Sequence, residues 1–496
     1  MNILFFKYVL ICLLLLMTLI LAMNGCSTSS EIEQCTLKGK IVLDSLFSNL
    51  DYSGITVAIY EVKSDTLISR LNSTYPLIGN QEIYNSFFDH RSGKKITSTS
   101  TNYDGTFEIK GLKPGVINIV IFKEEYGIRY FLEKNLNKGE NNIKNVLGRE
   151  EVCLKHEAIY SGIYQEGIYN FTKEVNTVIT QDVIFMEGTM VDIHPGAIIR
   201  IDPGKKIIFY GDLKIVGDVN DPFIFTSNDK IYSINYNDKI EYYDRISIMQ
   251  TANIEVGKVQ YGIFNNCNIG INFSNTINIC DCYFFNISNP IIGQGDLLNN
   301  DICNIVNCLL DNRNDTDLTM VSINSINKVN IENNIILGGD KGIYLTNIDV
   351  STIINNYLDC YNKSIDLHSE VSANIVNNDI ISDVTGINAY NQILLNIKHN
   401  NIISNIGMKF NYVNVNAFIE NNNIISNDYN IYSTTWGGED IQAPNNYWGT
   451  NIRSEIDAKI IDKNDFTPVS FQYYDYLTYV IYDPYKNQYI IGNGIH

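Results

Sequence analysis

A run of oxygen-bearing side chains near the middle of the chain is the stretch best suited to bind a metal ion. Its candidate ligands are Asp311, Asn314, Asp315 and Asp317. Carboxylate and amide oxygens suit calcium, a hard cation that takes about 6 to 8 oxygen ligands. The run lacks the central glycine and closing glutamate of an EF-hand loop. We therefore weigh a calcium site against a solvated polar loop, and expect no required cofactor.

The six histidines do not indicate a catalytic base. His194 precedes a Pro-Gly turn, His368 follows an expected strand, and His399 replaces an asparagine of the repeat described below. Acidic and basic residues also show no set that stacks on neighbouring repeats. We therefore assign no catalytic residue, although carboxylate pairs from distant repeats leave a polysaccharide lyase or glycoside hydrolase as an alternative.

The N-terminus has the pattern of an export signal. A lysine precedes an apolar run over residues 8–22, about the length of a signal-peptide core and short for a membrane span. The following Gly25-Cys26 resembles a bacterial lipobox. This resemblance implies a signal peptide over residues 1–25, lipidation of Cys26, a tether over residues 26–35, and a place at the cell surface or outer membrane. An uncleaved N-terminal anchor is the alternative.

Eight of the ten cysteines follow Cys26, and an exported chain can keep disulfides. Cys35 and Cys153 bracket the first domain, so a bond between them would close its ends. Cys280 and Cys282 lie two apart on an expected strand and therefore face the same way. We interpret them as small buried residues. The pairing is left open, and no Cys-x-x-Cys pair with zinc spacing occurs.

The composition favours many short strands, because charged residues make up only 18 % of the chain and proline is scarce at 9. The net charge is −19, and the sequence contains no run of basic residues. Nucleic-acid binding proteins need a basic face for the phosphate backbone. We therefore expect no nucleic-acid partner.

Three columns of residues recur with a period of 22 in the second half of the chain, one polar and two apolar. Self-similarity at a fixed period of about 20 to 50 residues signals a solenoid. The columns are Asn334, Asn356, Asn378, Asn400 and Asn422; Ile331, Ile353, Ile375, Ile397 and Ile419; and Ile336, Leu358, Ile380, Ile402 and Ile424.

Each repeat offers two or three short strands with apolar residues at i and i+2, such as Val329 and Ile331. Stacking turns at about 4.8 Å buries the columns in one core. Each asparagine stands where the chain turns, and its amide can bond to the copy in the next turn. A leucine-rich repeat has a similar period, but isoleucine outnumbers leucine here and a second alternating pair stands where that fold needs a helix.

Residues 36–150 predict a separate antiparallel β-sandwich. Apolar alternations over residues 55–59 and 117–121 indicate half-buried strands, and Asp104-Gly105 predicts a tight turn. This segment resembles the carboxypeptidase regulatory-like, or transthyretin-like, family, whose members are usually non-catalytic spacers or adhesive modules. The insertion over residues 67–100 is longer than that family's usual connection, which leaves its role open.

Residues 158–450 resemble the pectin-lyase-like fold, a right-handed parallel β-helix. Residues 188–201 and 210–217 are similar to its entry turns, and residues 443–450 to its closing motif. The open end of a solenoid needs covering, and Trp448 with the tyrosine-rich tail over residues 466–495, within the C-terminal segment 451–496, suits that role. We predict an all-β protein in which a small antiparallel β-sandwich precedes a right-handed parallel β-helix solenoid and a C-terminal cap.

These features favour a non-catalytic surface lipoprotein that presents its β-helix to a polysaccharide or another cell-surface partner, since a repetitive face suits a repetitive ligand. The lipid would join it to the membrane. A lyase or hydrolase on the same scaffold and a purely structural surface component are the alternatives.

Overall fold

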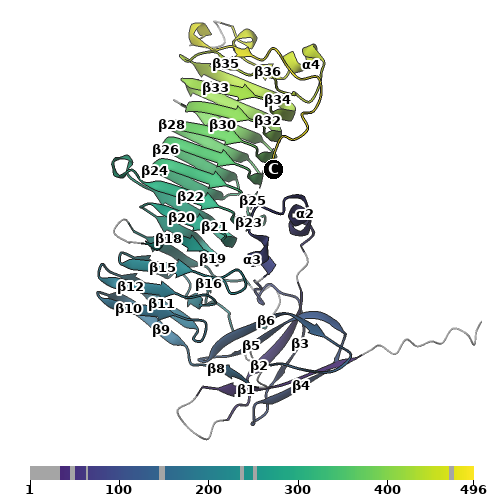
Figure 1. Ribbon diagram of the computed structural model, residues 1–496, viewed down its shortest axis with the longest axis vertical. Helices are drawn as coiled ribbons and strands as arrows, with labels where there is room; N and C mark the ends of the chain where they lie inside the picture. The colour runs from purple at the N-terminus through teal and green to yellow at the C-terminus, as the bar shows by residue number, and fades with distance from the viewer. Residues whose placement is uncertain are drawn as a thin grey trace, which may run out of the picture.

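The computed structural model describes nine stretches of the chain, residues 34–44, 51–62, 65–85, 87–144, 151–234, 239–249, 254–391, 393–467 and 474–495. Cys26, the expected signal peptide and most of the tether lie outside the described residues. Strands make up 59 % of the structure and helices 6 %. The predicted all-β fold class is confirmed, because a β-sandwich section precedes a parallel β-solenoid of about 12 turns (Figure 1).

Two four-stranded sheets form the N-terminal sandwich. The second sheet is antiparallel throughout, while in the first sheet β1 pairs antiparallel with β4 and parallel with β7 and β8. Alternate side chains, including Ile41, Val57 and Ile119, are buried between the sheets. The strands are β1 (Cys35–Leu43), β4 (Thr106–Leu112), β7 (Gly139–Asn142) and β8 (Glu151–Leu154), then β3 (Lys95–Ser100), β2 (Thr56–Glu61), β5 (Gly115–Lys123) and β6 (Gly127–Leu136).

The two cysteines that bracket the sandwich are free thiols. Cys35 begins β1, whereas Cys153 lies beside Val42 at the other end of the same strand. Seven residues of extended chain span about 23 Å, far beyond the reach of a disulfide. The bond that would close the domain is therefore absent, and hydrogen bonds from β1 to β7 and β8 join the ends of the sandwich instead.

The solenoid is a column in which each turn lays down three strand segments, and equivalent segments pair in parallel with those of the next turn (Figure 1). The segments stack into three walls. The first wall contains the starts of β9 (Ala158–Tyr164) and β11 (Thr177–Phe185), then β13 (Ile198–Ile201), β16 (Phe223–Ser227), the starts of β19 (Gly262–Phe273) and β21 (Tyr283–Gln294), β23 (Leu309–Asn312), β25 (Ile335–Gly338), β27 (Tyr357–Cys360), β29 (Asp379–Ser382), and the starts of β32 (Asn401–Val413) and β34 (Asn423–Trp436).

The other two walls follow in chain order. The second wall contains the ends of β9, β11, β19, β21, β32 and β34, the starts of β24 (Thr319–Glu332), β26 (Lys341–Ile354) and β28 (Lys363–Val376), and β14 (Lys206–Phe209), β17 (Tyr243–Ile248), β30 (Thr385–Tyr390) and β36 (Ile460–Ile461). The third contains the ends of β24, β26 and β28 with β10 (Gly167–Phe171), β12 (Thr189–Ile193), β15 (Asp212–Val216), β18 (Ile254–Gln260), β20 (Ile277–Cys280), β22 (Ile302–Val306), β31 (Ile393–Lys398), β33 (Val415–Glu420), β35 (Ile441–Gln442) and β37 (Val480–Ile481).

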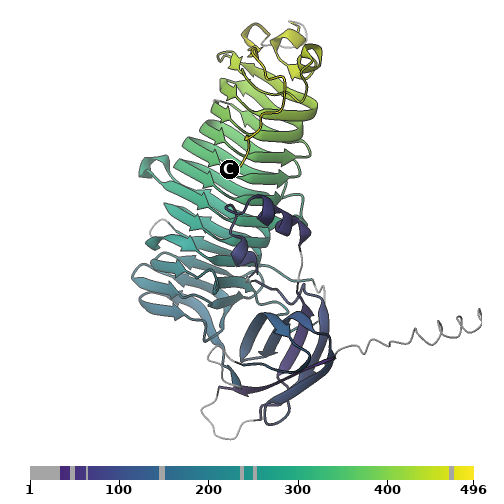
Figure 2. The same ribbon diagram turned by 45° about the vertical axis from the view of Figure 1, so that its right-hand side comes forward.

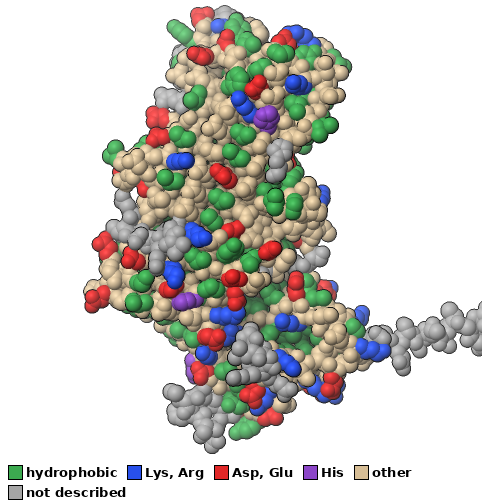
Figure 3. Space-filling view, viewed as in Figure 1, with side chains coloured by type: hydrophobic (Ala, Val, Ile, Leu, Met, Phe, Trp, Pro, Cys, Tyr) green, Lys and Arg blue, Asp and Glu red, His purple; other side chains and the backbone are tan. Residues whose placement is uncertain are grey.

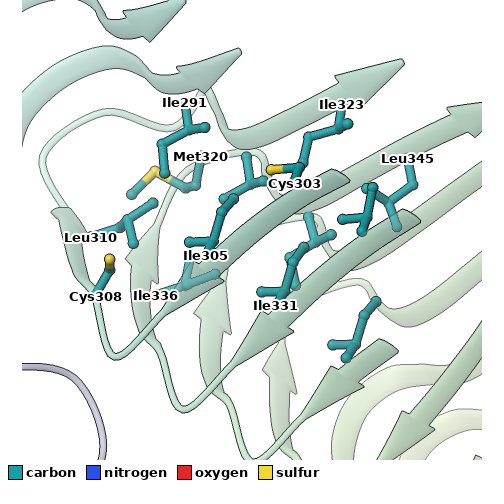
Figure 4. Packing of buried hydrophobic residues seen from close by; sticks show 14 of the residues in the cluster. Ile291, Cys303, Ile305, Cys308, Leu310, Met320, Ile323, Ile331, Ile336 and Leu345 are labelled. Atoms are coloured by element: carbon teal, nitrogen blue, oxygen red, sulfur yellow. The ribbon is translucent and has the colours of Figure 1, made fainter. Parts of the chain in front are cut away.

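The apolar columns predicted from the 22-residue period point into the column's interior. Every member of both columns is fully buried, and Figure 4 shows Ile305, Ile331 and Ile336 packed there with neighbours from other turns. One turn is a residue shorter on the second wall, where Ile387 pairs with Met408 and Met408 with Ile431. The slip changes the register without interrupting the core.

The asparagine column forms a ladder of buried hydrogen bonds at the corner where each turn enters the first wall. Each side-chain amide donates to the next carbonyl oxygen, from Asn334 through Asn356, Asn378, Asn400 and Asn422 to Asn446, at 2.9 to 3.0 Å. The residue before each ladder position has a left-handed φ of 54° to 57°, at Asn333, Asn355, Asn377, His399 and Asn421. Asparagine and histidine tolerate that conformation better than most residues, which accounts for His399.

The sandwich packs directly against the solenoid. Arg91, 1 % exposed, pairs with buried Asp89 at 2.9 Å and donates to the carbonyl oxygen of Ser227 at 2.7 Å and to the Thr226 hydroxyl at 2.7 Å. Next to it His90 contacts the Tyr130 hydroxyl and a solenoid carbonyl oxygen. Buried polar groups are costly unless they are paired, and here the pair is satisfied by groups of both modules, so these contacts join the sandwich to the solenoid at this junction.

The long insertion in the sandwich covers the outer face of the first wall. Helices α2 (Thr66–Thr74) and α3 (Gln81–Asn85) run beside the column in Figures 1 and 2. Their buried side chains pack on an apolar outer row of that wall, formed by Ile263, Tyr283, Leu309, Ile335 and Tyr357. The role that the sequence left open is therefore to shield this row from water.

The C-terminal segment caps the column and then returns along the same wall. Trp448 is 1 % exposed and packs edge-on against Tyr482 at 6.3 Å. Beyond it, the amide of Ile490 donates to Asn423 and that of Gly494 to the carbonyl oxygen of His399, both at 2.8 Å. The remaining short helices are α4 (Arg453–Asp457), η1 (Leu297–Asn299), η2 (Lys463–Asp465) and η3 (Tyr474–Tyr476).

Candidate ligand-binding face

The predicted calcium ligands do not all face one point. Asp311, 3 % exposed, accepts hydrogen bonds from Arg313 at 2.6 and 2.7 Å, and Arg313 also donates to Asp65 at 2.6 Å. Asp65 in turn caps helix α2. Asp311 therefore serves an ion-pair network that joins the solenoid to the insertion.

The other three predicted ligands, Asn314, Asp315 and Asp317, lie exposed in the turn over residues 313–318. This is the extruded loop that the longer repeat interval implies, since the equivalent connection one turn later is only residues 339–340. The Asp315 carboxylate accepts the amide of Asp317 at 3.1 Å. Within the described ranges, no group of three or more His, Cys, Asp or Glu side chains is placed to hold a metal ion. Calcium binding by this turn stays a prediction.

The strongest concentration of charge chemistry lies on the outer face of the second wall. Asp366 on β28 is fully buried and accepts hydrogen bonds from the His368 ring at 2.9 Å and the Asn388 amide at 2.7 Å. Lys341 and Lys363 are ion-paired with the same carboxylate at 2.9 and 3.3 Å. Strand pairing produces this meeting, because Lys341 pairs with Lys363 and Asp366 with Asn388.

These contacts fix the charge state of the carboxylate. Burial alone would raise the pKa of Asp366, but the hydrogen bonds from His368 and Lys341 and the charge of Lys363 outweigh burial and hold that pKa well below its usual range. An ionised carboxylate only accepts hydrogen bonds, so Nε2 of His368 carries the proton that faces it and Nδ1 is left to another partner. The two ammonium groups and the single carboxylate leave a surplus of one positive charge in this cluster.

A column of rings runs along the same wall beside this cluster. Ring centroids are 5.2 Å apart from Tyr344 to His368, 5.1 Å from His368 to Tyr390, and 4.4 Å from Tyr390 to Tyr412. The rings of His368 and Tyr390 are nearly parallel, at 15°, whereas Tyr344 is tilted by 52° to His368 and Tyr412 by 45° to Tyr390. We call this set, with Lys341, Lys363 and Asp366, the second-wall ridge.

The ridge is not among the predictions from the sequence. His368 was predicted to follow a strand, whereas it lies within β28, and no acidic and basic residues were predicted to stack on neighbouring turns, whereas Lys341, Lys363 and Asp366 meet in this way. The 22-residue period, applied to outward positions, aligns Lys341 with Lys363 and His368 with Tyr390.

The ridge offers hydrogen bonds and charge to a ligand that repeats along the solenoid axis. In the view of Figure 3, lysine and arginine side chains are scattered among acidic ones. None of the described helices has the length and apolar character that crossing a bilayer requires. Comparisons with protein-family models, with curated proteins and with solved structures find no match to this chain.

Proposed function

We propose that this protein is a non-catalytic cell-surface lipoprotein whose second-wall ridge binds a glycan. The observation that supports it is the ridge itself, in which Tyr344, His368, Tyr390 and Tyr412 place polar groups at the spacing of the solenoid turns. Repetition suits a polymeric ligand, because each added ligand unit meets a similar set of groups. Tyrosine hydroxyls and ammonium groups donate to sugar oxygens.

The rest of the chain suits display of that face. The insertion and the C-terminal segment cover the first wall, and the buried Arg91 pair holds the sandwich firmly on the column. In this proposal lipidated Cys26 anchors the chain to the outer membrane, and the rigid sandwich holds the column away from the lipid. Radioactive palmitate labelling tests the anchor, since a Cys26→Ala variant that still takes up label would refute it.

A glycan array probed with purified residues 30–496 tests the ligand. We expect binding that Tyr390→Ala weakens and that Phe418→Ala leaves unchanged, because Phe418 is an exposed aromatic residue on the third wall, away from the ridge. Calcium and chelator arms of the same array test the turn over residues 313–318. Binding to no glycan would refute the proposal and favour a structural surface component.

The second candidate function is a polysaccharide lyase or glycoside hydrolase, and one observation favours it. Asp366 orients His368, and a carboxylate that fixes an imidazole is the supporting half of a general-base pair. Assaying the array supernatants for new reducing ends or unsaturated products separates the two functions. Product that disappears in His368→Gln would make the enzyme the correct interpretation.

A further inference from the structure

A cavity of about 390 Å³ lies where the sandwich, the insertion and the solenoid meet. Its volume is within the usual range of small-molecule sites, about 300 to 1,000 Å³, and such sites favour junctions between modules. Its lining comes from β2, β5 and β6 of the sandwich, from α3 and the segment that follows it, and from β21 of the solenoid. The cavity lies apart from the second-wall ridge, since β21 contributes its first-wall residues Tyr283 and Phe285.

Aromatic rings form one side of this cavity. Tyr283 is buried, and its ring lies edge-on to Tyr84 at 5.6 Å and to Phe87 at 6.0 Å. Phe87 also contacts Phe285 at 6.5 Å, and Phe88 completes the aromatic lining. Ring faces carry partial negative charge and attract cations.

Carboxylates line the same cavity. Glu61 is ion-paired with Lys94 at 2.9 Å, and the buried carboxylate of Asp89 is neutralised by Arg91. Glu133 is exposed and forms no ion pair with any residue that the structure describes. It is therefore the lining carboxylate whose charge remains available to a ligand.

The backbone at Glu133 is irregular and is fixed by a hydrogen bond of its own amide. A register shift between β5 and β6 leaves a bulge at this point, and Glu133 adopts a left-handed φ of 48°. The amide of Glu133 donates to the side chain of buried Asn118 at 2.9 Å, which fills the gap in the ladder. Bulges redirect side chains, and strained non-glycine backbone concentrates at binding sites.

A neighbouring cavity of about 320 Å³ shares Asn85, Leu132 and Glu133 and is lined by two basic residues. Lys173 is ion-paired with Asp221, and Arg129 lies 3.7 Å from Glu174. Both cations are therefore partnered elsewhere and do not neutralise Glu133.

We propose that the junction cavity binds a small organic ammonium ion. Aromatic faces would hold the alkyl groups and the cation, and Glu133 would supply the opposing charge. A metal ion would gain little from aromatic walls, and a neutral apolar ligand would gain nothing from Glu133. This site is independent of the ridge and of its glycan.

Isothermal titration of the purified protein with choline, and with its neutral isostere in which carbon replaces nitrogen, tests the proposal. We expect choline to bind and the isostere to bind at least tenfold more weakly, a factor that corresponds to about 1.4 kcal/mol. Glu133→Gln should weaken choline binding by about tenfold, whereas Glu124→Gln, another exposed glutamate of the sandwich, should not. Phe87→Leu should also weaken it, because leucine keeps the apolar surface and removes the ring.

Two outcomes would overturn the proposal. Equal binding of choline and the isostere would show that the cavity does not recognise charge, and binding of neither compound at millimolar concentration would show that it takes no ammonium ion of this size. Tyr390→Ala should leave choline binding unchanged, so this result does not depend on the glycan. Circular dichroism of each variant checks that the fold is retained.

Discussion

Replacing Asn378 by alanine removes the hydrogen bonds that its side chain makes in the middle of the ladder. Its side-chain amide has two protons, which it shares among Asn400 at 2.9 Å and the carbonyl oxygens of Ile353 and Val376 at 2.9 and 3.0 Å. Its side-chain oxygen accepts hydrogen bonds from the backbone amide and the side-chain amide of Asn356 at 2.9 and 3.0 Å. All of these contacts are buried or partly buried, so solvent does not easily replace them.

The expected cost follows from the groups left without partners. The backbone amide of Asn356 loses its acceptor, and the carbonyl oxygen of Ile353 loses a donor in a dry corner of the column. Each buried unpaired group costs about 1 to 3 kcal/mol. We therefore expect Asn378→Ala to lower the free energy of unfolding by about 2 to 5 kcal/mol.

Asn396→Ala is the matched control, because Asn396 donates to Asn374 at 3.1 Å from the solvent-facing side of the third wall. Water can take over that bond, so the loss should be below about 0.5 kcal/mol. Urea unfolding followed by circular dichroism measures both variants, and hydrogen exchange at the Asn356 amide reports the local effect. If both variants lose the same stability, or if exchange at Asn356 is unchanged, the ladder does not stabilise the corner as we describe.

Three further changes test other parts of the structure. Arg313→Met leaves the buried charge of Asp311 unpaired and removes the ion pair that ties Asp65, the N-cap residue of α2, to the solenoid. Limited proteolysis should therefore cut residues 65–85 faster in Arg313→Met than in Arg313→Lys. Asp366→Asn should lower the thermal unfolding temperature at pH 7. The stability from Asp366 is present above its unfolded pKa near 3.8 and is lost only as the pH falls through its lower folded value, so the difference should persist at pH 4. Burial lowers the pKa of His90 to about 4 from 6.5, against the opposing charge of Asp89. The unfolded chain therefore takes up this proton first, and stability should fall by about 3 kcal/mol between pH 6.5 and 4. Urea unfolding measured at several pH values in that range should show that the free energy of unfolding falls less steeply with decreasing pH in His90→Gln than in the unchanged protein. An equal fall in both would refute the lowered pKa of His90.

The inward half of the solenoid could be predicted because burial repeats. Ile331 and Ile336 recur every 22 residues since only an apolar side chain fits a dry core, and Asn334 recurs because its amide bonds to its own copy. Outward positions carry no such constraint. Tyr344, Asp366 and Asn388 are neighbours in one outward row, but they are of three different residue types, so the row does not appear as a repeated column in the sequence.

The contact between the insertion and the first wall is reflected in the sequence by apolar residues at outward positions of that wall. The outer row of the first wall is apolar at Ile263, Tyr283, Leu309, Ile335 and Tyr357, positions that would carry polar residues on an exposed wall. Strands that are apolar on both faces are covered on both faces. What covers them cannot be found from periodicity, because α2 and α3 lie far earlier in the sequence, in a different module.

The coverage of the first wall also limits where the proposed ligand could bind. The chain's own insertion and C-terminal segment occupy the first wall, so a partner that runs along the axis must use the second or the third. On the third wall the outward asparagines bond to each other, as Asn330 does to Asn304 at 2.6 Å, which uses part of their capacity within the protein. On the second wall Lys341 and Lys363 share a single carboxylate and keep further ammonium donors. A ligand there can therefore gain charge-assisted hydrogen bonds, which are roughly twice as strong as neutral ones.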